Sequence, residues 1–187
     1  MDLDKNLLIS SGHETTKKLK LKDWDPDYTG GKSKRDMEYE LSKLSSRMSE
    51  LQYKLFADSS KSILIILQGV DASGKDGTIR SVMGALNPQS CYVKPFKFPT
   101  TEEISHDYLW RVHIAVPQRG QIAIFNRSHY EDVINVLVND KDSEKDIGSR
   151  FRQINDFERY LSENSITIIK FFLHISKNEQ KKNCKRD

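Results

Sequence analysis

The residues with the clearest chemistry lie in a glycine-rich stretch, GVDASGKDGT, at residues 69–78. A glycine, four residues, a second glycine and a lysine let successive backbone N–H groups point inward at phosphate oxygens, whose charge the lysine neutralises. A buried-strand pattern precedes the stretch and a helical pattern follows it, so a helix N-terminus would face the same phosphates. The alternative is a tight strand-to-helix turn whose glycines serve backbone geometry alone. We predict a phosphate-binding loop formed by Gly69, Ala72, Ser73, Gly74, Lys75, Asp76, Gly77 and Thr78.

Two carboxylates belong to this stretch, and carboxylates beside phosphates require a cation between them. Asp71 lies inside the loop, and Asp76 takes the position at which a Ser or Thr commonly touches magnesium. We therefore predict one or two Mg²⁺ ions with Asp71 as a ligand. For Asp76 two interpretations stay open: a metal ligand, or a carboxylate at a helix start that the helix dipole favours.

A second polar group, FNRSHYED at residues 125–132, follows an apolar strand pattern. In open α/β sheets ligands bind at the carboxyl ends of the strands, so this group is expected beside the phosphate loop. Asn126 can ligate a metal ion or its water, and Arg127 can bind phosphates through two parallel hydrogen bonds and stabilise transferring charge. The candidate catalytic residues are therefore Asp71, Lys75, Asn126 and Arg127, and the candidate metal ligands are Asp71 and Asn126.

Structural roles compete for three residues of this second group. Ser128 is suited to cap a helix, and Glu131, three positions later, would complete a capping box. His129 can be imagined as a nucleophile that accepts phosphate. A lone histidine beside a helix cap more commonly has a structural role.

Other polar residues are candidates for contacting a substrate. Lys97 lies between aromatic residues, and Arg111 lies in a helical pattern that can face the same cleft. Taken singly, each cation is typical of a solvated surface, and only the nearby phosphate loop favours a collective role, because a polyanion needs many cations. The candidate substrate-binding residues are Lys97, Arg111, Tyr130, Glu131 and Asp132.

Hydrophobic periodicity predicts alternating strands and helices around these residues, and hence an α/β fold with a mainly parallel sheet covered by helices. Strands are expected at residues 62–68, 91–98, 121–125 and 166–173, and helices at residues 34–56, 75–85, 101–116, 128–138 and 147–161. The helix over residues 34–56 has one apolar face, which indicates an outer helix packed on the core or a seam for a partner helix. Residues 1–33 are expected to form an extended arm, and residues 34–187 the phosphate-binding domain.

The composition restricts the class of protein. Of 187 residues, 36% are hydrophobic and 30% are charged, which is typical of a soluble globular domain. The net charge of +3 equals that of residues 177–187, which hold five basic and two acidic groups, so no large basic face for nucleic acid is expected. No apolar run is long enough to cross a membrane, and no signal peptide is recognisable. With two cysteines outside any metal-binding pattern, a cytoplasmic protein is expected.

Several ordered motifs resemble the polyphosphate kinase 2 family. They are LQGVDASGKDGTIRSVM, NPQSCYVKPFKFPTTEEISHDYLWRVHIAVPQRGQIAIFNRSHYED, INDFERYL and IIKFFLHISKNEQ, and the resemblance covers about residues 20–182. It implies a P-loop kinase fold, with three α/β/α layers and an N-terminal helical extension. It also assigns a Walker A role to residues 69–75, with Asp71 as a functional carboxylate, and a Walker B-like role to Asn126 and Arg127.

The resemblance further implies an activity. Family members transfer a terminal phosphate between inorganic polyphosphate and a nucleotide with Mg²⁺, and the FNRSHYED form is similar to members that act on nucleoside mono- or diphosphates such as AMP and ADP. Polyphosphate and adenine or guanine nucleotides are thus the implied partners, and a homo-oligomer is the implied assembly. Direct in-line transfer is the mechanism we favour, because phosphoryl transfer depends on positioning and charge neutralisation.

The sequence departs from the family at its C-terminal end. Family members continue into an arginine- and lysine-rich lid and a final core strand, whereas this sequence stops at KKNCKRD. A C-terminally truncated domain with an exposed sheet edge is therefore expected. Two other functions remain as alternatives: an ATP-dependent nucleotide kinase, and a non-catalytic P-loop domain that binds phosphate or a partner.

Overall fold

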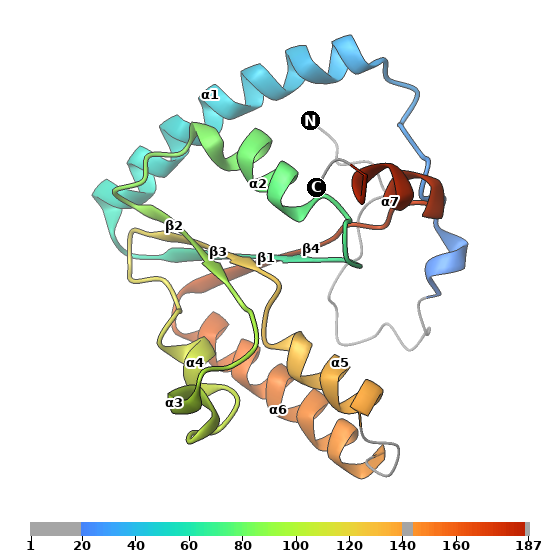
Figure 1. The fold of residues 1–187 in the computed structure, drawn as a ribbon. Coiled ribbons are helices and arrows are strands. Elements are labelled where there is room, and N and C mark those ends of the chain that lie inside the picture. The colour runs from blue at the N-terminus through green and yellow to red at the C-terminus, as the bar shows by residue number, and fades with distance from the viewer. Residues whose placement is uncertain (1–19, 140–143, 186–187) are drawn as a thin grey trace.

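A parallel sheet of four strands lies at the centre of the structure, a computed structural model that describes residues 20–139 and 144–185 (Figure 1). The strand order is β2-β3-β1-β4, and every neighbouring pair is parallel. The predicted α/β fold with a mainly parallel sheet is confirmed. The strands are β1 Ser62–Gln68, β2 Cys91–Pro95, β3 Ile122–Asn126 and β4 Ile166–Phe172.

Helices cover both faces of the sheet (Figure 1). One face carries α1 Lys34–Asp58, α2 Lys75–Val82 and the 3-10 turn η2 Met83–Ala85. The other face carries α3 Thr101–Ile104, α4 Trp110–His113, α5 Tyr130–Asn139 and α6 Glu144–Glu163. The 3-10 turn η1 Leu21–Asp23 precedes these elements, and α7 Lys177–Asn183 follows β4. None of the helices described is long and apolar enough to cross a membrane.

Alternation along β1 divides the core between the two faces, because successive side chains of a strand point to opposite sides. Leu64 and Ile66 are fully buried in a cluster that includes residues of α4 and α6. Ile65 and Leu67 belong to a second cluster, against which side chains of α1 and α2 pack. A strand buried on both faces explains the continuous apolar run in the sequence.

The long helix α1 uses only part of its apolar face. It begins at a capping box, in which the Ser33 hydroxyl accepts a hydrogen bond from the Asp36 N–H and the Asp36 carboxylate accepts one from the Ser33 N–H. Met48 and Leu55 pack against the core cluster on its side of the sheet. Three apolar residues of the same face are exposed: Met37, Leu44 and Leu51.

The largest differences from the elements predicted from the sequence concern residues 91–98 and 101–116. The helix expected over residues 101–116 is two short helices, α3 and α4, separated by a turn. In that turn the Asp107 carboxylate accepts a hydrogen bond from the N–H of Leu109, a side-chain contact that competes with continuous helix. The strand expected over residues 91–98 stops at Pro95, where its ladder with β3 ends.

Strand β4 is an edge strand that pairs with β1 alone within residues 20–139 and 144–185. Ile169, Phe171 and Phe172 on it are exposed. This geometry agrees with the exposed sheet edge expected from the sequence.

Candidate phosphate-binding site

The stretch at residues 69–78 forms the turn from β1 into α2. Gly74 precedes α2 with φ 88°, in the left-handed region that glycine adopts without strain. At Gly69 space is limiting, since a Cβ there would lie 2.6 Å from Ser73 Oγ and 3.1 Å from the carbonyl oxygen of Leu173. The tight loop therefore requires both glycines, and the first N–H groups of α2 are available at its end.

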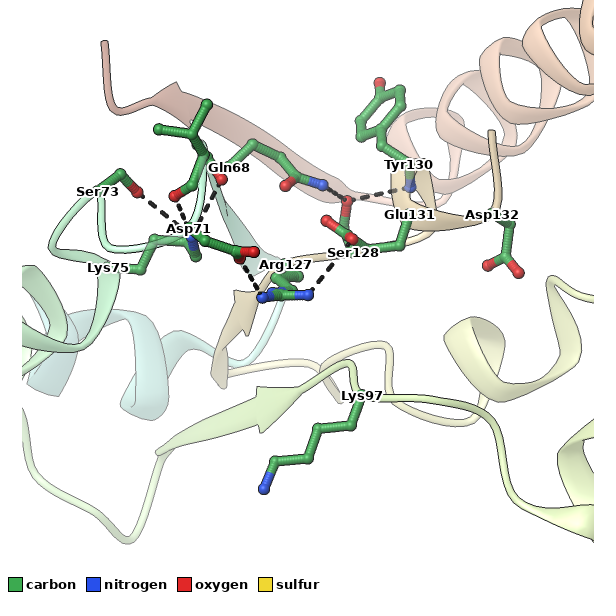
Figure 2. Close-up of polar contacts among 12 residues, drawn as sticks. Gln68, Asp71, Ser73, Lys75, Lys97, Arg127, Ser128, Tyr130, Glu131 and Asp132 are labelled. Atoms are coloured by element: carbon green, nitrogen blue, oxygen red, sulfur yellow. Dashed lines mark hydrogen bonds and ion pairs between the residues drawn. The ribbon is translucent and has the colours of Figure 1, made fainter. Parts of the chain in front are cut away.

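Lys75 lies inside this loop with only 8% of its surface exposed. Its ammonium donates to the carbonyl oxygens of Gly69 and Val70, both at 3.0 Å, and lies 3.3 Å from Ser73 Oγ (Figure 2). Burial lowers the pKa of Lys75, and the charge of Arg127 lowers it further, although nearby carboxylates oppose both effects. The ammonium can exchange these neutral acceptors for phosphate oxygens, which form stronger, charge-assisted hydrogen bonds.

Arg127 follows β3 and reaches the same loop. Its φ of 64° is in the left-handed region, where a non-glycine residue costs about 1–2 kcal/mol. Its Nη2 donates to Asp71 Oδ1 at 2.6 Å, and its Nη1 lies 3.7 Å from Glu131 Oε2 (Figure 2). A second cation therefore lies beside Lys75, held by carboxylates.

A second contact joins the last residue of β3 to α2, the helix that follows β1. Asn126 Nδ2 donates to Asp76 Oδ1 at 2.6 Å. Because β1 and β3 are adjacent and parallel, the segments that follow them both leave the sheet at the carboxyl ends of its strands. The structure thus brings together all the residues that the sequence proposed as catalytic: Asp71, Lys75, Asn126 and Arg127.

Asp71 and Asn126 are also the metal ligands expected from the sequence. Among the described residues, no cluster of three or more His, Cys, Asp or Glu side chains is able to hold a metal ion. The Asp71 side chain is 86% exposed and offers hard oxygen donors. Mg²⁺ is usually bound through one or two carboxylates plus substrate phosphates and waters, so this donor set fits a magnesium ion that arrives with a phosphate substrate.

The candidate substrate-binding residues do not form one group. The Arg111 side chain is 5% exposed, and its guanidinium lies 3.5 Å from both Glu103 and Asp132 and donates to the carbonyl oxygen of Lys97. Burial raises the pKa of Asp132, and Arg111 opposes that shift. Arg111 and Asp132 are therefore neutralised inside the fold, and neither the solvated-surface interpretation nor direct substrate contact fits this burial of Arg111.

Of the other three candidates, only Glu131 faces the candidate catalytic residues, through Arg127. Lys97 is exposed, and in Figure 2 its side chain extends away from the phosphate loop. The Tyr130 hydroxyl instead donates to Glu158 Oε1 at 2.6 Å.

The start of α5 differs from the predicted capping box. The Ser128 hydroxyl accepts hydrogen bonds from the N–H of Tyr130 at 3.3 Å and from Gln68 Nε2 at 2.8 Å. Because the Glu131 carboxylate lies toward Arg127, the side chain that would complete the box is engaged elsewhere. The helix accordingly begins at Tyr130, two residues later than predicted.

Glu158 of α6, which sequence analysis did not single out, holds the segment that follows Arg127. Its carboxylate accepts hydrogen bonds from Tyr130 and, at 2.7 Å, from Lys170, and it lies 3.2 Å from His129 Nε2. Burial alone raises the pKa of Glu158, but the hydrogen bonds from these three partners outweigh it and lower the pKa to about 2. His129 is fully buried, which excludes it as an accessible phosphate acceptor.

This cluster predicts sensitivity to acid. The ordinary pKa of a glutamate is 4.5, and in the folded protein that of Glu158 is about 2. A lowered pKa contributes stability that is complete above pH 4.5 and is lost as the pH falls toward 2, here about 3 kcal/mol. We expect Glu158→Gln to lower the free energy of unfolding at neutral pH and to flatten its decline on acidification.

Urea unfolding at a series of pH values measures both effects. Asp156→Asn is the matched control, because that carboxylate is on the same helix in an exposed pair with Arg159. Identical pH dependence of unfolding in the wild type and Glu158→Gln would contradict the role of the cluster.

Comparison with known proteins agrees with this geometry. Residues 31–186 match the polyphosphate kinase 2 (PPK2) family. The AMP/ADP-polyphosphate phosphotransferase of Meiothermus ruber is 46% identical over 168 residues, which are 88% of this chain and 62% of that protein. The ADP-polyphosphate phosphotransferase of Rhodopseudomonas palustris is 43% identical over 148 residues, 73% of this chain and 51% of that protein.

A solved structure is also similar. The crystal structure of polyphosphate kinase 2 from Arthrobacter aurescens TC1 matches with a TM-score of 0.87 and 40% sequence identity, over 97% of this chain and 64% of that chain. The present chain thus spans between 51% and 64% of the length of these relatives. On the match over residues 31–186, the chain belongs to the polyphosphate kinase 2 family.

Proposed function

We propose that this chain carries the phosphoryl-transfer centre of a PPK2-type phosphotransferase, which moves a terminal phosphate between inorganic polyphosphate and AMP or ADP. The observation that carries the proposal is the convergence of two cations, Lys75 and Arg127, from adjacent strands on one glycine-rich loop. Like charges side by side repel, and the charge of Arg127 lowers the pKa of Lys75 through that repulsion. A polyanion bound between the two cations removes it.

In-line transfer requires positioning and charge neutralisation, and the site residues divide this work. Loop N–H groups and Lys75 hold the phosphates, while Arg127 donates to the transferring group. For this, Arg127 leaves Asp71, whose carboxylate then becomes available, with Asn126, to hold Mg²⁺. Bound Mg²⁺ would supply neutralisation of the phosphate charge.

The names of the relatives support the choice of substrates. The Meiothermus protein is named for AMP and ADP, and a Pseudomonas aeruginosa relative, 28% identical, is named a GDP-polyphosphate phosphotransferase. Polyphosphate and adenine nucleotides are therefore the proposed substrates of this chain, with guanine nucleotides as further acceptors. The proposed setting is cytoplasmic.

A homo-oligomer belongs to the same proposal. Met37, Leu44 and Leu51 recur every seven residues on α1 and are exposed, a spacing that suits packing against a partner helix. Light scattering in solution would measure the oligomeric state.

The experiment that tests the function compares phosphate donors on the purified chain. With Mg²⁺ and polyphosphate, ADP is expected to yield ATP and AMP to yield ADP, whereas ATP without polyphosphate is expected to give no ADP from AMP. Product formation is followed by chromatography, and removal of Mg²⁺ by a chelator should stop it.

Each alternative has its own outcome in this experiment. Transfer from ATP but not from polyphosphate would identify the ATP-dependent nucleotide kinase instead. Binding of tripolyphosphate and ADP by calorimetry, with no product from either donor, would identify the non-catalytic phosphate-binding domain.

A further inference from the structure

Two amide side chains of α7 contact the phosphate loop from outside. Gln180 Nε2 donates to the carbonyl oxygen of Asp71 at 2.8 Å, and Asn183 Nδ2 donates to that of Ala72 at 2.9 Å. The contacts join residues 109 and 111 positions apart, so local sequence patterns do not reveal them. The sequence analysis assigned no role to either amide.

These contacts determine the direction of a loop N–H. A peptide group is planar and trans, so a carbonyl oxygen and the N–H of the next residue point in opposite directions. With its carbonyl held toward α7, Asp71 leaves the N–H of Ala72 pointing to the opposite side. Within residues 20–139 and 144–185 no acceptor takes this N–H, which leaves it for an anion.

The backbone at this position also needs outside support. Ala72 has φ 57°, in the left-handed region that a residue with a Cβ rarely adopts. The loop is exposed at Asp71, so packing alone does not hold this conformation. The hydrogen bond from Asn183 to the Ala72 carbonyl oxygen ties the strained residue to a helix.

Helix α7 is itself fixed to the sheet, which makes it a suitable support. The N–H of Leu173, which follows β4, donates to the carbonyl oxygen of Gln68 at 2.8 Å, directly before the loop. The Ser176 hydroxyl then caps α7 by accepting from the N–H of Glu179. Gln180 and Asn183 are three residues apart and so lie on one face of the helix.

We propose that Gln180 and Asn183 are positioning residues that hold the loop in its anion-binding shape before any substrate arrives. The inference rests on the proposed function and deepens it. A loop that already has its bound shape loses little conformational entropy on binding. Loss of this preformed shape therefore weakens the affinity for linked phosphates. One neutral hydrogen bond corresponds to a change of about three- to tenfold in affinity.

The test uses the variants Gln180→Leu and Asn183→Leu with two measurements. Calorimetry gives the affinity for tripolyphosphate, and ¹⁵N relaxation gives the order parameters of the loop N–H groups in the ligand-free protein. We expect affinity about three- to tenfold weaker and lower order parameters confined to residues 71–73. The melting temperature should fall by at most a few degrees, because water can reach the carbonyl oxygens of these exposed and half-buried contacts.

Controls separate the hydrogen bond from charge and folding. Gln180→Glu keeps the size of the side chain but replaces the donor, and it serves if the leucine variant fails to fold. Asn178→Asp adds the same negative charge at an exposed position on the same helix and should change neither measurement. An equal effect of Asn178→Asp and Gln180→Glu would overturn the inference, because charge alone would then account for it.

The remaining outcomes distinguish the inference from the proposed function. If the wild type binds no tripolyphosphate, the proposed function fails, while the loop order parameters of the variants still decide the inference. Order parameters that match the wild type in folded variants overturn the positioning role, whether or not affinity changes.

Discussion

Arg127→Gly is expected to lower the turnover of polyphosphate-dependent ATP formation by about 10³-fold or more while leaving the protein as stable as the wild type. An arginine that stabilises a transferring phosphoryl group is worth at least this factor in kcat. Stability is preserved because glycine adopts the φ of 64° without strain. The lost pair with Asp71 is exposed, with side chains 42% and 86% accessible, and contributes only about 0–1 kcal/mol. The second lost pair, with Glu131, is long at 3.7 Å and adds little.

Two further substitutions at this position serve as controls. Arg127→Ala should lose the same activity but melt at a lower temperature than Arg127→Gly, because alanine keeps the backbone strain. Arg127→Lys keeps the charge but not the paired N–H groups, and should recover only part of the turnover. Turnover of Arg127→Gly within tenfold of the wild type would exclude Arg127 from the chemistry.

Lys75→Met is expected to lower the rate of transfer by about 10²- to 10³-fold, the usual cost of removing one donor to developing charge. Methionine fills most of the space of the lysine stem but gives no charge to the phosphates. The carbonyl oxygens of Gly69 and Val70 lose their donor, so a loss of stability of about 1–3 kcal/mol accompanies the change. Initial-rate kinetics and thermal unfolding measure the two effects.

Lys61→Met is the matched control. Lys61 is exposed and directly precedes β1, so it removes the same charge at the end of the strand opposite to the phosphate loop. This variant should keep wild-type kinetics. If Lys75→Met and Lys61→Met were equally active, the loop would not bind phosphate through its lysine.

Most of the fold could be predicted from the sequence, because the hydrophobic patterns of strands and of helices are each visible within a short segment. The run at residues 62–68 is buried on both faces and is β1 within its predicted bounds. The prediction of one helix over residues 101–116 was wrong, and hydrophobic periodicity contains no signal for the reason. There the Asp107 carboxylate competes for a backbone N–H and interrupts the helix.

That the candidate site residues lie close together was predictable for a different reason. Residues at the carboxyl ends of adjacent parallel strands must meet, so placing Lys75 after one strand and Arg127 after another was enough. Single cations elsewhere gave no such constraint. Arg111 was proposed as a substrate contact, yet it is buried between Glu103 and Asp132. These partners lie on two separate elements, α3 and α5, so the sequence near Arg111 does not reveal the pairing.

Polar contacts between residues far apart in the chain could not be predicted from the sequence. Glu158 belongs to the motif INDFERYL, but its partners come from α5 and β4, 28 and 12 residues away for Tyr130 and Lys170. The amides of Gln180 and Asn183 meet the loop only through the turn after β4. Such contacts depend on topology, which must be known before they are sought.

Within residues 20–139 and 144–185 no strand pairs with the outer side of β4, which has a consequence for this chain at high concentration. Residues 168–172 read IIKFF, and Lys170 is their single charge. The Lys170 ammonium is paired with Glu158, so its charge only partly prevents the strand from pairing with another molecule. Concentrated solutions should therefore form cross-β aggregates that are templated by backbone hydrogen bonds at this strand.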